Sequence, residues 1–137
     1  QPKWDRGATE QVRARMTQPS YVLDVPTTPR ELMGVLGMAR LCLAMRLHTL
    51  IFAARMAVPA MGLVYDPKVA SYLEELDLPA AGDVEAFDGP EAIRRADALL
   101  KDYDAVLACL RKKSAQLTQA AGENERLLLE LLESSKR

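Results

Sequence analysis

Five polar side chains interrupt the apolar middle of the chain, and their types suit the binding and protonation of a small anion. They fall into two groups, Arg46 with His48, and Tyr65 with Asp66 and Lys68. A guanidinium offers paired donors to a carboxylate or phosphate, an ammonium offers a compact charge, and an imidazole transfers protons near neutral pH. A core does not accept unpaired charges, so we expect these side chains to surround a ligand at its surface.

The elements that must position these groups follow from the apolar pattern. Strands are expected over 21–25, 40–44 and 60–64, and helices over 8–16, from Pro29 onward, 48–57 and 66–76. The alternation predicts an α/β fold, a Rossmann-like three-layer unit with a short parallel sheet and crossover helices. The strands are almost entirely apolar, as expected of strands buried on both faces.

Helix starts carry their own short-range signals. Thr28, Pro29 and Glu31 have the spacing of a capping box with proline at the first helical position. Asp66 followed by Pro67 is the same kind of start, with Asp66 as the N-cap.

The two polar groups lie one structural unit apart. The first directly follows the run 40–44, the second follows the run 60–64, and His48 and Lys68 are 20 residues apart. Consecutive parallel strands usually neighbour each other, so both turns should face the crevice outside the carboxyl ends, where open α/β sheets bind ligands. Two helix N-termini should point into this crevice and add their positive dipole ends. The spacing therefore predicts an anion site.

A purely structural interpretation of the same residues stays open at this point. A single histidine at a helix start is often a satisfied structural residue, and Arg46 has two acidic candidates for an ion pair, Asp24 and Asp66. Asp66 is expected to act as a helix cap in preference to a proton acceptor.

The composition changes after the last expected strand. Glycine, proline and acidic residues over 78–90 predict a loop, and apolar residues at a 3–4 spacing predict helices after residue 89, with a break near 101–104. We expect a Rossmann-like part over 1–88, which would bind the ligand, and C-terminal helices over 89–137 that pack on it. A partner-binding role for the leucine-rich tail is the alternative.

Bulk properties limit the class of protein. The chain has 137 residues and a net charge of −1, which gives no indication of binding to nucleic acid or an anionic membrane. Cys42, Cys109 and the single His48 form no metal-ligand pattern, so no metal site and two reduced thiols are expected. Charges interrupt every apolar stretch before the roughly 18 residues of a membrane span. There is no signal-peptide pattern and no initiating methionine, so we expect a cytoplasmic protein and a piece of a longer chain.

The sequence "MRLHTLIFAA" followed by "VPAMGLVYDPKV" resembles the signature of the polysaccharide pyruvyl transferase family, most closely bacterial cell-wall members of the CsaB type. The resemblance extends from about Asp24 to the end of the chain and departs at Ala44, where serine or glycine is commoner. It implies a two-domain architecture like that of GT-B glycosyltransferases, of which this chain would be a partial C-terminal domain.

The resemblance also implies a reaction. A pyruvyl group would move from phosphoenolpyruvate, the donor substrate, to two hydroxyls of a lipid-linked or polymeric cell-wall sugar, without a cofactor, and the ketal would help to anchor S-layer proteins. Arg46 and Lys68 would hold the donor, His48 would protonate it, and Tyr65 and Asp66 would line the pocket. The fragment alone would be inactive.

Two other functions are open on the sequence. One is a GT-B glycosyltransferase or sugar-nucleotide epimerase domain, for which the segment 82–92 offers a loose match to a ribose-binding turn. The other is a non-catalytic interaction module that binds through its helical tail. An unpaired sheet edge also predicts a homodimer or an exchange of elements between copies.

Overall fold

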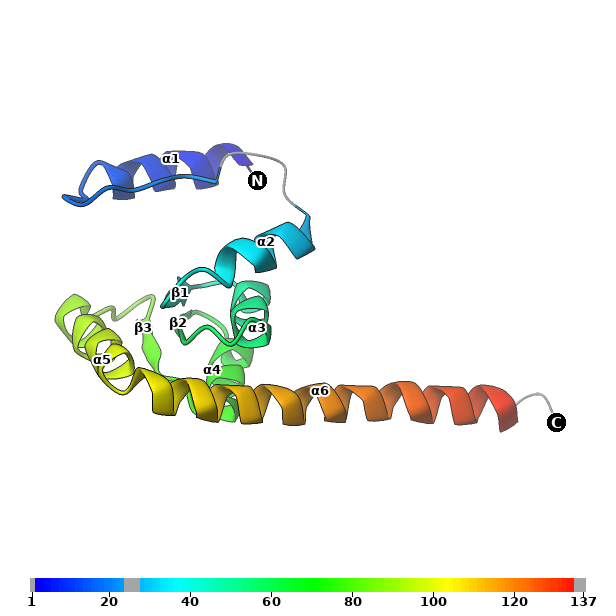
Figure 1. Cartoon of the computed structure of the whole chain (residues 1–137). Helices are drawn as coiled ribbons and strands as arrows, with labels where there is room; N and C mark the ends of the chain where they lie inside the picture. The colour runs from blue at the N-terminus through cyan, green and yellow to red at the C-terminus, as the bar shows by residue number, and fades with distance from the viewer. Residues whose placement is uncertain (1, 24–27, 135–137) are drawn as a thin grey trace.

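The computed structural model describes residues 2–23 and 28–134, and Figure 1 shows the order of its elements. They are α1 (Pro2–Arg13), α2 (Pro29–Leu36), β1 (Cys42–Ala44), α3 (Leu47–Arg55), β2 (Ala60–Val64), α4 (Pro67–Glu75), β3 (Ala80–Asp83), α5 (Gly89–Lys101) and α6 (Tyr103–Ser134).

The sheet has three parallel strands in the order β1-β2-β3. Cys42 lies opposite Ala60 and Ala44 lies opposite Gly62. The two strands expected over 40–44 and 60–64 are therefore confirmed as parallel neighbours, and the carboxyl ends of both lie at one edge. The predicted α/β class with a short parallel sheet and a helical C-terminal region is also confirmed.

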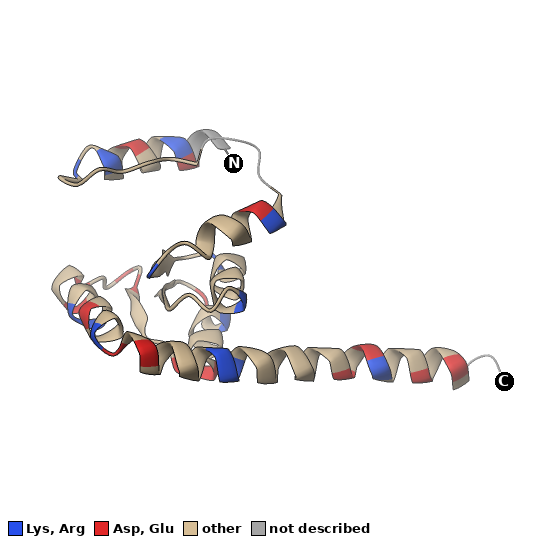
Figure 2. Cartoon of the chain, in the orientation of Figure 1, with Lys and Arg blue, Asp and Glu red and all other residues tan. Residues whose placement is uncertain are grey.

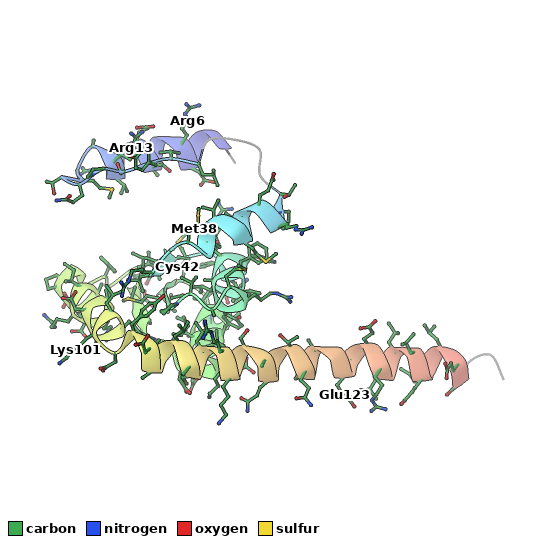
Figure 3. The ribbon with its side chains drawn as sticks, viewed as in Figure 1. Arg6, Arg13, Met38, Cys42, Lys101 and Glu123 are labelled. Atoms are coloured by element: carbon green, nitrogen blue, oxygen red, sulfur yellow. The ribbon has the colours of Figure 1, made fainter. Side chains whose placement is uncertain are left out.

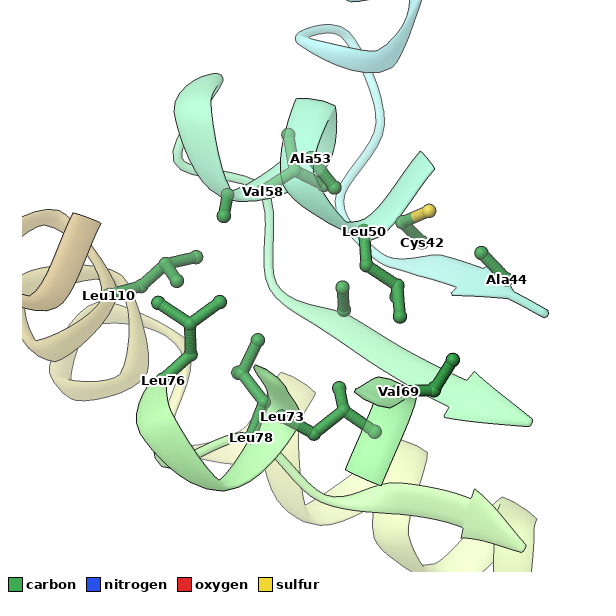
Figure 4. Close-up of a cluster of buried hydrophobic side chains, with 12 residues drawn as sticks. Cys42, Ala44, Leu50, Ala53, Val58, Val69, Leu73, Leu76, Leu78 and Leu110 are labelled. Atoms are coloured by element: carbon green, nitrogen blue, oxygen red, sulfur yellow. The ribbon is translucent and has the colours of Figure 1, made fainter. Parts of the chain in front are cut away.

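Helices cover both faces of the sheet, which makes three layers. On one face α3 and α4 contribute the fully buried Leu50, Val69 and Leu73, and α6 adds Leu110 to the same cluster (Figure 4). On the other face Leu99 of α5 packs on Met61 and Ala81. The central strand β2 is thus buried on both sides, in keeping with its apolar sequence, whereas Leu43 on the edge strand β1 is 58% exposed.

The close approach of α4 to the sheet requires glycine in β2. A Cβ atom on Gly62 would lie 2.6 Å from Cδ1 of Leu73 and 3.2 Å from Cγ1 of Val69. Both side chains are buried, so they have little room to move.

The predicted helix caps are confirmed. The Thr28 hydroxyl accepts a hydrogen bond from the Glu31 amide, and the Glu31 carboxylate accepts one from the Thr28 amide. The Asp66 carboxylate accepts a bond of 2.9 Å from the Lys68 amide at the start of α4. The helix expected over 8–16 begins earlier, as α1.

Two consecutive helix–strand connections are built alike. Ala57 after α3 and Asp77 after α4 both have positive φ angles, 54° and 55°. The following amides close the turn in the same way, with Val58 N to Ala53 O at 2.8 Å and Leu78 N to Leu73 O at 2.9 Å. Both connections then pass through a proline into a strand.

The loop expected over 78–90 is wrong in its first part, because β3 occupies it. Ala80 pairs with Gly62, and a bulge then shifts the register so that Asp83 lies opposite Val64. Small residues with weak strand preference form this strand because β2 offers them a free edge. Gly82 takes the φ of 149° that the bulge requires and is covered by Phe87.

The strand expected over 21–25 is wrong for the described residues 21–23, and residues 24–25 lie outside the described part. Residues 21–23 are extended but unpaired, and Tyr21 is 94% exposed. A β-rich composition does not make a strand without a neighbouring strand to bond, and here the segment runs beside α1 (Figure 1).

The C-terminal region is helical, with the expected break at Asp102 between α5 and α6. The first half of α6 packs through Val106, Leu110 and Leu117 against the α3–α4 cluster. From Thr118 to Ser134 every residue is exposed, and Figure 1 shows this half extending past the rest of the molecule.

Candidate anion site at the carboxyl edge of the sheet

The two predicted groups occupy equivalent positions on two adjacent helices. Arg46 is the N-cap of α3 and Asp66 is the N-cap of α4. Two residues further on, His48 and Lys68 both occupy the second position of their helices. Because β1 and β2 are parallel neighbours, the two helix starts lie at the same edge of the sheet.

The electrostatic character of these helix starts is positive. Neither α3 nor α4 has an acidic residue in its first turn, so the positive dipole end of α3 is not offset by a carboxylate of its own helix. Arg46 makes no side-chain cap bond to α3. Of the two N-caps, only the carboxylate of Asp66 neutralises its helix end.

Asp66 and Lys68 form a local pair. The Lys68 Nζ lies 3.1 Å from Oδ2 of Asp66, while Oδ1 accepts the Lys68 amide. The backbone hydrogen bond, followed by the side-chain bond, lowers the pKa of Asp66. The same carboxylate raises the pKa of the Lys68 ammonium, with a smaller contribution from Tyr65. Both groups therefore stay charged over a wider pH range.

Arg46 forms an ion pair that sequence reasoning missed. Its Nη2 lies 3.0 Å from Oδ2 of Asp5 on α1, and the two side chains are 67% and 61% exposed. Of the two expected candidates, Asp66 pairs with Lys68 instead, and Asp24 lies outside the described residues. An exposed pair of this kind contributes little to stability, so a ligand anion can replace Asp5 at modest cost.

A groove on the outer side of β1 begins at this ion pair. It has a volume of about 790 Å³ and is lined by Asp5 and Arg46 at its polar end and by apolar residues including Val12, Tyr21 and Leu43. His48 and Lys68 do not line this groove. Its largely apolar walls are unsuited to a small, highly charged donor.

The missed strand β3 brings a third helix start to the same edge, with the opposite charge. Asp83 ends β3, Asp88 caps α5 through a bond to the Glu91 amide, and Glu91 lies in the first turn of that helix. The edge thus changes from basic at β1 to acidic at β3. No sequence signal marked Asp83, because β3 itself lacked a strand pattern.

The structure thus brings the predicted residues to one edge, yet each cation has its own carboxylate. No hydrogen bond or ion pair within residues 2–23 and 28–134 joins Arg46, His48 and Lys68 to one another. His48 and Tyr65 are exposed, and Tyr65 adjoins the cap of α4. Across the same described ranges, no group of three or more histidine, cysteine or acidic residues is arranged to hold a metal ion.

An open parallel sheet with helix starts at its carboxyl edge defines a class of α/β domains that bind small ligands there. The family model for polysaccharide pyruvyl transferase matches residues 1–67 of this chain. Over this segment, just under half of its length, the chain is similar to the polysaccharide pyruvyl transferase family. No curated protein and no solved structure matches it.

The matched segment covers α1 through β2 and includes four of the five predicted site residues. It starts before Asp24, where the resemblance was expected to begin, and ends at Pro67, one residue before Lys68. The closer relation to cell-wall members and the GT-B architecture remain predictions. None of the described helices combines the length and apolar character needed to cross a membrane.

Proposed function

We propose that the protein transfers a pyruvyl group from phosphoenolpyruvate to two hydroxyls of one sugar in a bacterial cell-wall polysaccharide, in the cytoplasm. The match of residues 1–67 to the polysaccharide pyruvyl transferase family supports a pyruvyl transferase. The observation that carries the donor assignment is the pair of equivalent helix starts on neighbouring parallel strands, with Arg46, His48 and Lys68 at one edge. Phosphoenolpyruvate carries the two kinds of anion, a carboxylate and a phosphate, that such a site recognises.

In this proposal the two cations bind the donor. Arg46 releases Asp5 and binds the carboxylate or the phosphate of the donor instead. A planar guanidinium can bind two oxygens of either group at once. Lys68 keeps its contact with Asp66 and adds a positive charge beside the second helix start. The first turn of α3 supplies further backbone amide donors, whereas in α4 Pro67 has no N–H and the Lys68 amide already donates to Asp66.

The chemical step requires a proton at carbon. A proton adds to the methylene carbon of the donor, and the first sugar hydroxyl attacks the resulting oxocarbenium-like centre. The C–O bond to phosphate then breaks, and the second hydroxyl attacks the same carbon. Of the two hydroxyl protons released, one balances the proton gained by the methyl group and one leaves on hydrogen phosphate.

His48 is the proposed proton donor for this step. It is exposed in the first turn of α3, beside Arg46, so a donor held by the guanidinium lies next to the imidazole. General acid catalysis by a correctly placed histidine contributes about 10²–10⁴-fold to the rate. Asp66 is a poor proton acceptor because both of its oxygens are engaged and its pKa is lowered, so we assign it to capping and to positioning Lys68. Tyr65 lines the same turn.

The test compares donor binding and turnover in the native protein. His48→Ala should lower kcat about 10²–10⁴-fold and leave donor affinity nearly unchanged, because a proton donor acts mainly in the transition state. Arg46→Ala and Lys68→Ala should weaken donor binding by about tenfold to a hundredfold, since each removes a charge-assisted contact. Ketal formation and phosphate release are measured together, with phosphoenolpyruvate binding measured by calorimetry.

Arg30→Ala serves as the matched control, because Arg30 is an exposed arginine on α2 away from the sheet edge. It should leave both measurements unchanged. A wild-type turnover rate for His48→Ala would make His48 structural. Donor binding that survives both cation variants would move the donor to another site.

A further inference from the structure

The second half of α6 is an apolar surface that no other segment of the described residues covers. Five leucines lie within six residues, and all are about half exposed or more: Leu127 46%, Leu128 56%, Leu129 54%, Leu131 69% and Leu132 53%. Figure 3 shows the side chains of this half, around the labelled Glu123, extending away from the rest of the molecule. Exposed leucines at this density mark an interaction surface.

This surface continues the face by which α6 packs on its own molecule. The packed half uses Val106, Leu110 and Leu117. The same 3–4 spacing continues in the free half through Ala120, Ala121, Asn124, Leu127, Leu128 and Leu131. Positions 110, 117, 124 and 131 are seven residues apart, as in a helix that packs along its whole length on other helices. We refer to the six residues of the free half as the tail stripe.

The tail stripe is complementary to itself when reversed about Asn124. In that register Leu117 lies at the level of Leu131 in a second copy, and the small pair Ala120–Ala121 lies opposite the large pair Leu127–Leu128. Alternating small and large residues allow two helices to interdigitate. We propose that two copies of this chain associate through their α6 helices, antiparallel, with a two-fold axis at Asn124.

Asn124 suits the centre of such a pair. An amide side chain both donates and accepts, so two copies related by a two-fold axis can form reciprocal hydrogen bonds. A single asparagine in an apolar seam fixes the register of paired helices, because any shift leaves the amide without a partner.

The charges along α6 favour the antiparallel direction. The free half carries four glutamates and one arginine, whereas the packed half carries the basic run Arg111, Lys112 and Lys113 (Figure 2). In an antiparallel pair Glu130 and Glu133 lie at the levels of Thr118 and Ala115 of the other copy, next to the C-terminal end of its basic run. A parallel pair would place the acidic halves against each other. Arg126 already contacts Glu123 and Glu130, so the charges near the axis are partly neutralised within each helix.

A pocket lies beside α6 at the junction between its packed half and the tail stripe. It has a volume of about 230 Å³ and lies between Ile51 of α3, Tyr72 of α4, and Leu117 and Ala121 of α6. In the proposed register Leu131 of the second copy reaches the level of Leu117, at the mouth of this pocket. The tail of each copy would thus end against the body of the other, which buries its most exposed leucine.

The first experiment measures mass by sedimentation equilibrium on the full chain. The wild-type chain should be a dimer, and Leu128→Glu should weaken association by about tenfold or more, because it places a charge in the centre of the seam. Leu129→Glu is the control, since Leu129 is equally exposed but lies outside the stripe. It should remain a dimer. Circular dichroism establishes that both variants keep their helix content.

The second experiment tests direction by disulfide formation. In a Cys109→Ser background, Ala120→Cys and Leu128→Cys chains with different tags are mixed and oxidised. The antiparallel register predicts disulfides between the two kinds of chain. Disulfides within one kind only would show parallel pairing and overturn the proposal, as would a monomeric wild-type chain or an equal effect of Leu128→Glu and Leu129→Glu.

Discussion

Ala57 and Asp77 hold the same left-handed backbone conformation, 20 residues apart, at the ends of α3 and α4. Each sets the angle at which its helix returns to the sheet through a proline-containing turn. Because the two connections match, the strands that follow lie side by side, and the two helix starts lie at equivalent points. The equivalence of His48 and Lys68 therefore rests on two turns at the opposite edge of the sheet.

Ala57→Gly should stabilise the protein by about 0.5–1 kcal/mol, because glycine takes a positive φ without the steric penalty that a Cβ atom imposes. The midpoint of thermal unfolding and the free energy from urea denaturation measure this change. Ala70→Gly, on the exposed face of α4, is the control and should destabilise by about 1 kcal/mol. Equal destabilisation by both variants would contradict a left-handed conformation at Ala57.

Gly62→Ala should destabilise the protein by about 1–3 kcal/mol, because the added methyl group overlaps the buried Leu73 and Val69 side chains. Urea denaturation measures the loss. Gly122→Ala provides the opposite case, since nothing lies within 4 Å of a Cβ atom there and alanine is the better helix former. That variant should gain about 0.5–1 kcal/mol. A neutral Gly62→Ala would show that α4 packs less closely on β2 than described.

The lowered pKa of Asp66 predicts a pH dependence of stability. A carboxyl group whose pKa is lower in the folded state stabilises the fold above its unfolded pKa, near 4, and this contribution is lost as the pH falls through the folded pKa. Asp66→Asn keeps a good N-cap but removes the titration. The free energy of unfolding of the variant should therefore fall less steeply below about pH 4 than that of the wild type.

Glu31, Asp77, Glu91 and Glu123 also have lowered pKa values and are present in both proteins. The difference between the two pH profiles therefore isolates Asp66. Parallel profiles for wild type and variant would show that the hydrogen bond from the Lys68 amide does not form in solution.

Asp5→Asn should strengthen the binding of phosphoenolpyruvate by up to a few fold, because it removes the carboxylate that competes for Arg46. Stability should change by less than about 1 kcal/mol, as expected of an exposed ion pair. Calorimetry at two salt concentrations measures the binding, and the gain should shrink at higher salt. In an Arg46→Ala background the Asp5 substitution should have no effect on binding, and a persisting gain would separate Asp5 from the donor site.

The helix caps and two of the strands could be predicted because they depend on residues close together in the sequence. The caps at Thr28 and Asp66 depend on residues three positions apart or fewer, and the β1 and β2 strands are short apolar runs between clear helix signals. The sequence therefore located the two helix starts and the sheet edge at which both lie.

The features that depend on distant residues were not predictable. The Ala80–Asp83 strand has weak strand preference and forms because β2 leaves an edge for it, whereas residues 21–23 have the preference but no neighbouring strand. The pair of Arg46 with Asp5 joins residues 41 positions apart, and nothing near Arg46 in the sequence indicates it.

The length of α6 affects the hydrodynamic behaviour of this protein. At 1.5 Å per residue, its 32 residues extend over about 48 Å, whereas a compact domain of 137 residues has a radius of gyration of only about 14 Å. The molecule should therefore encounter more friction than a sphere of its mass and elute early from a sizing column even as a monomer. Elution volume alone would suggest a dimer whether or not one forms, so association has to be judged by a method that does not depend on shape.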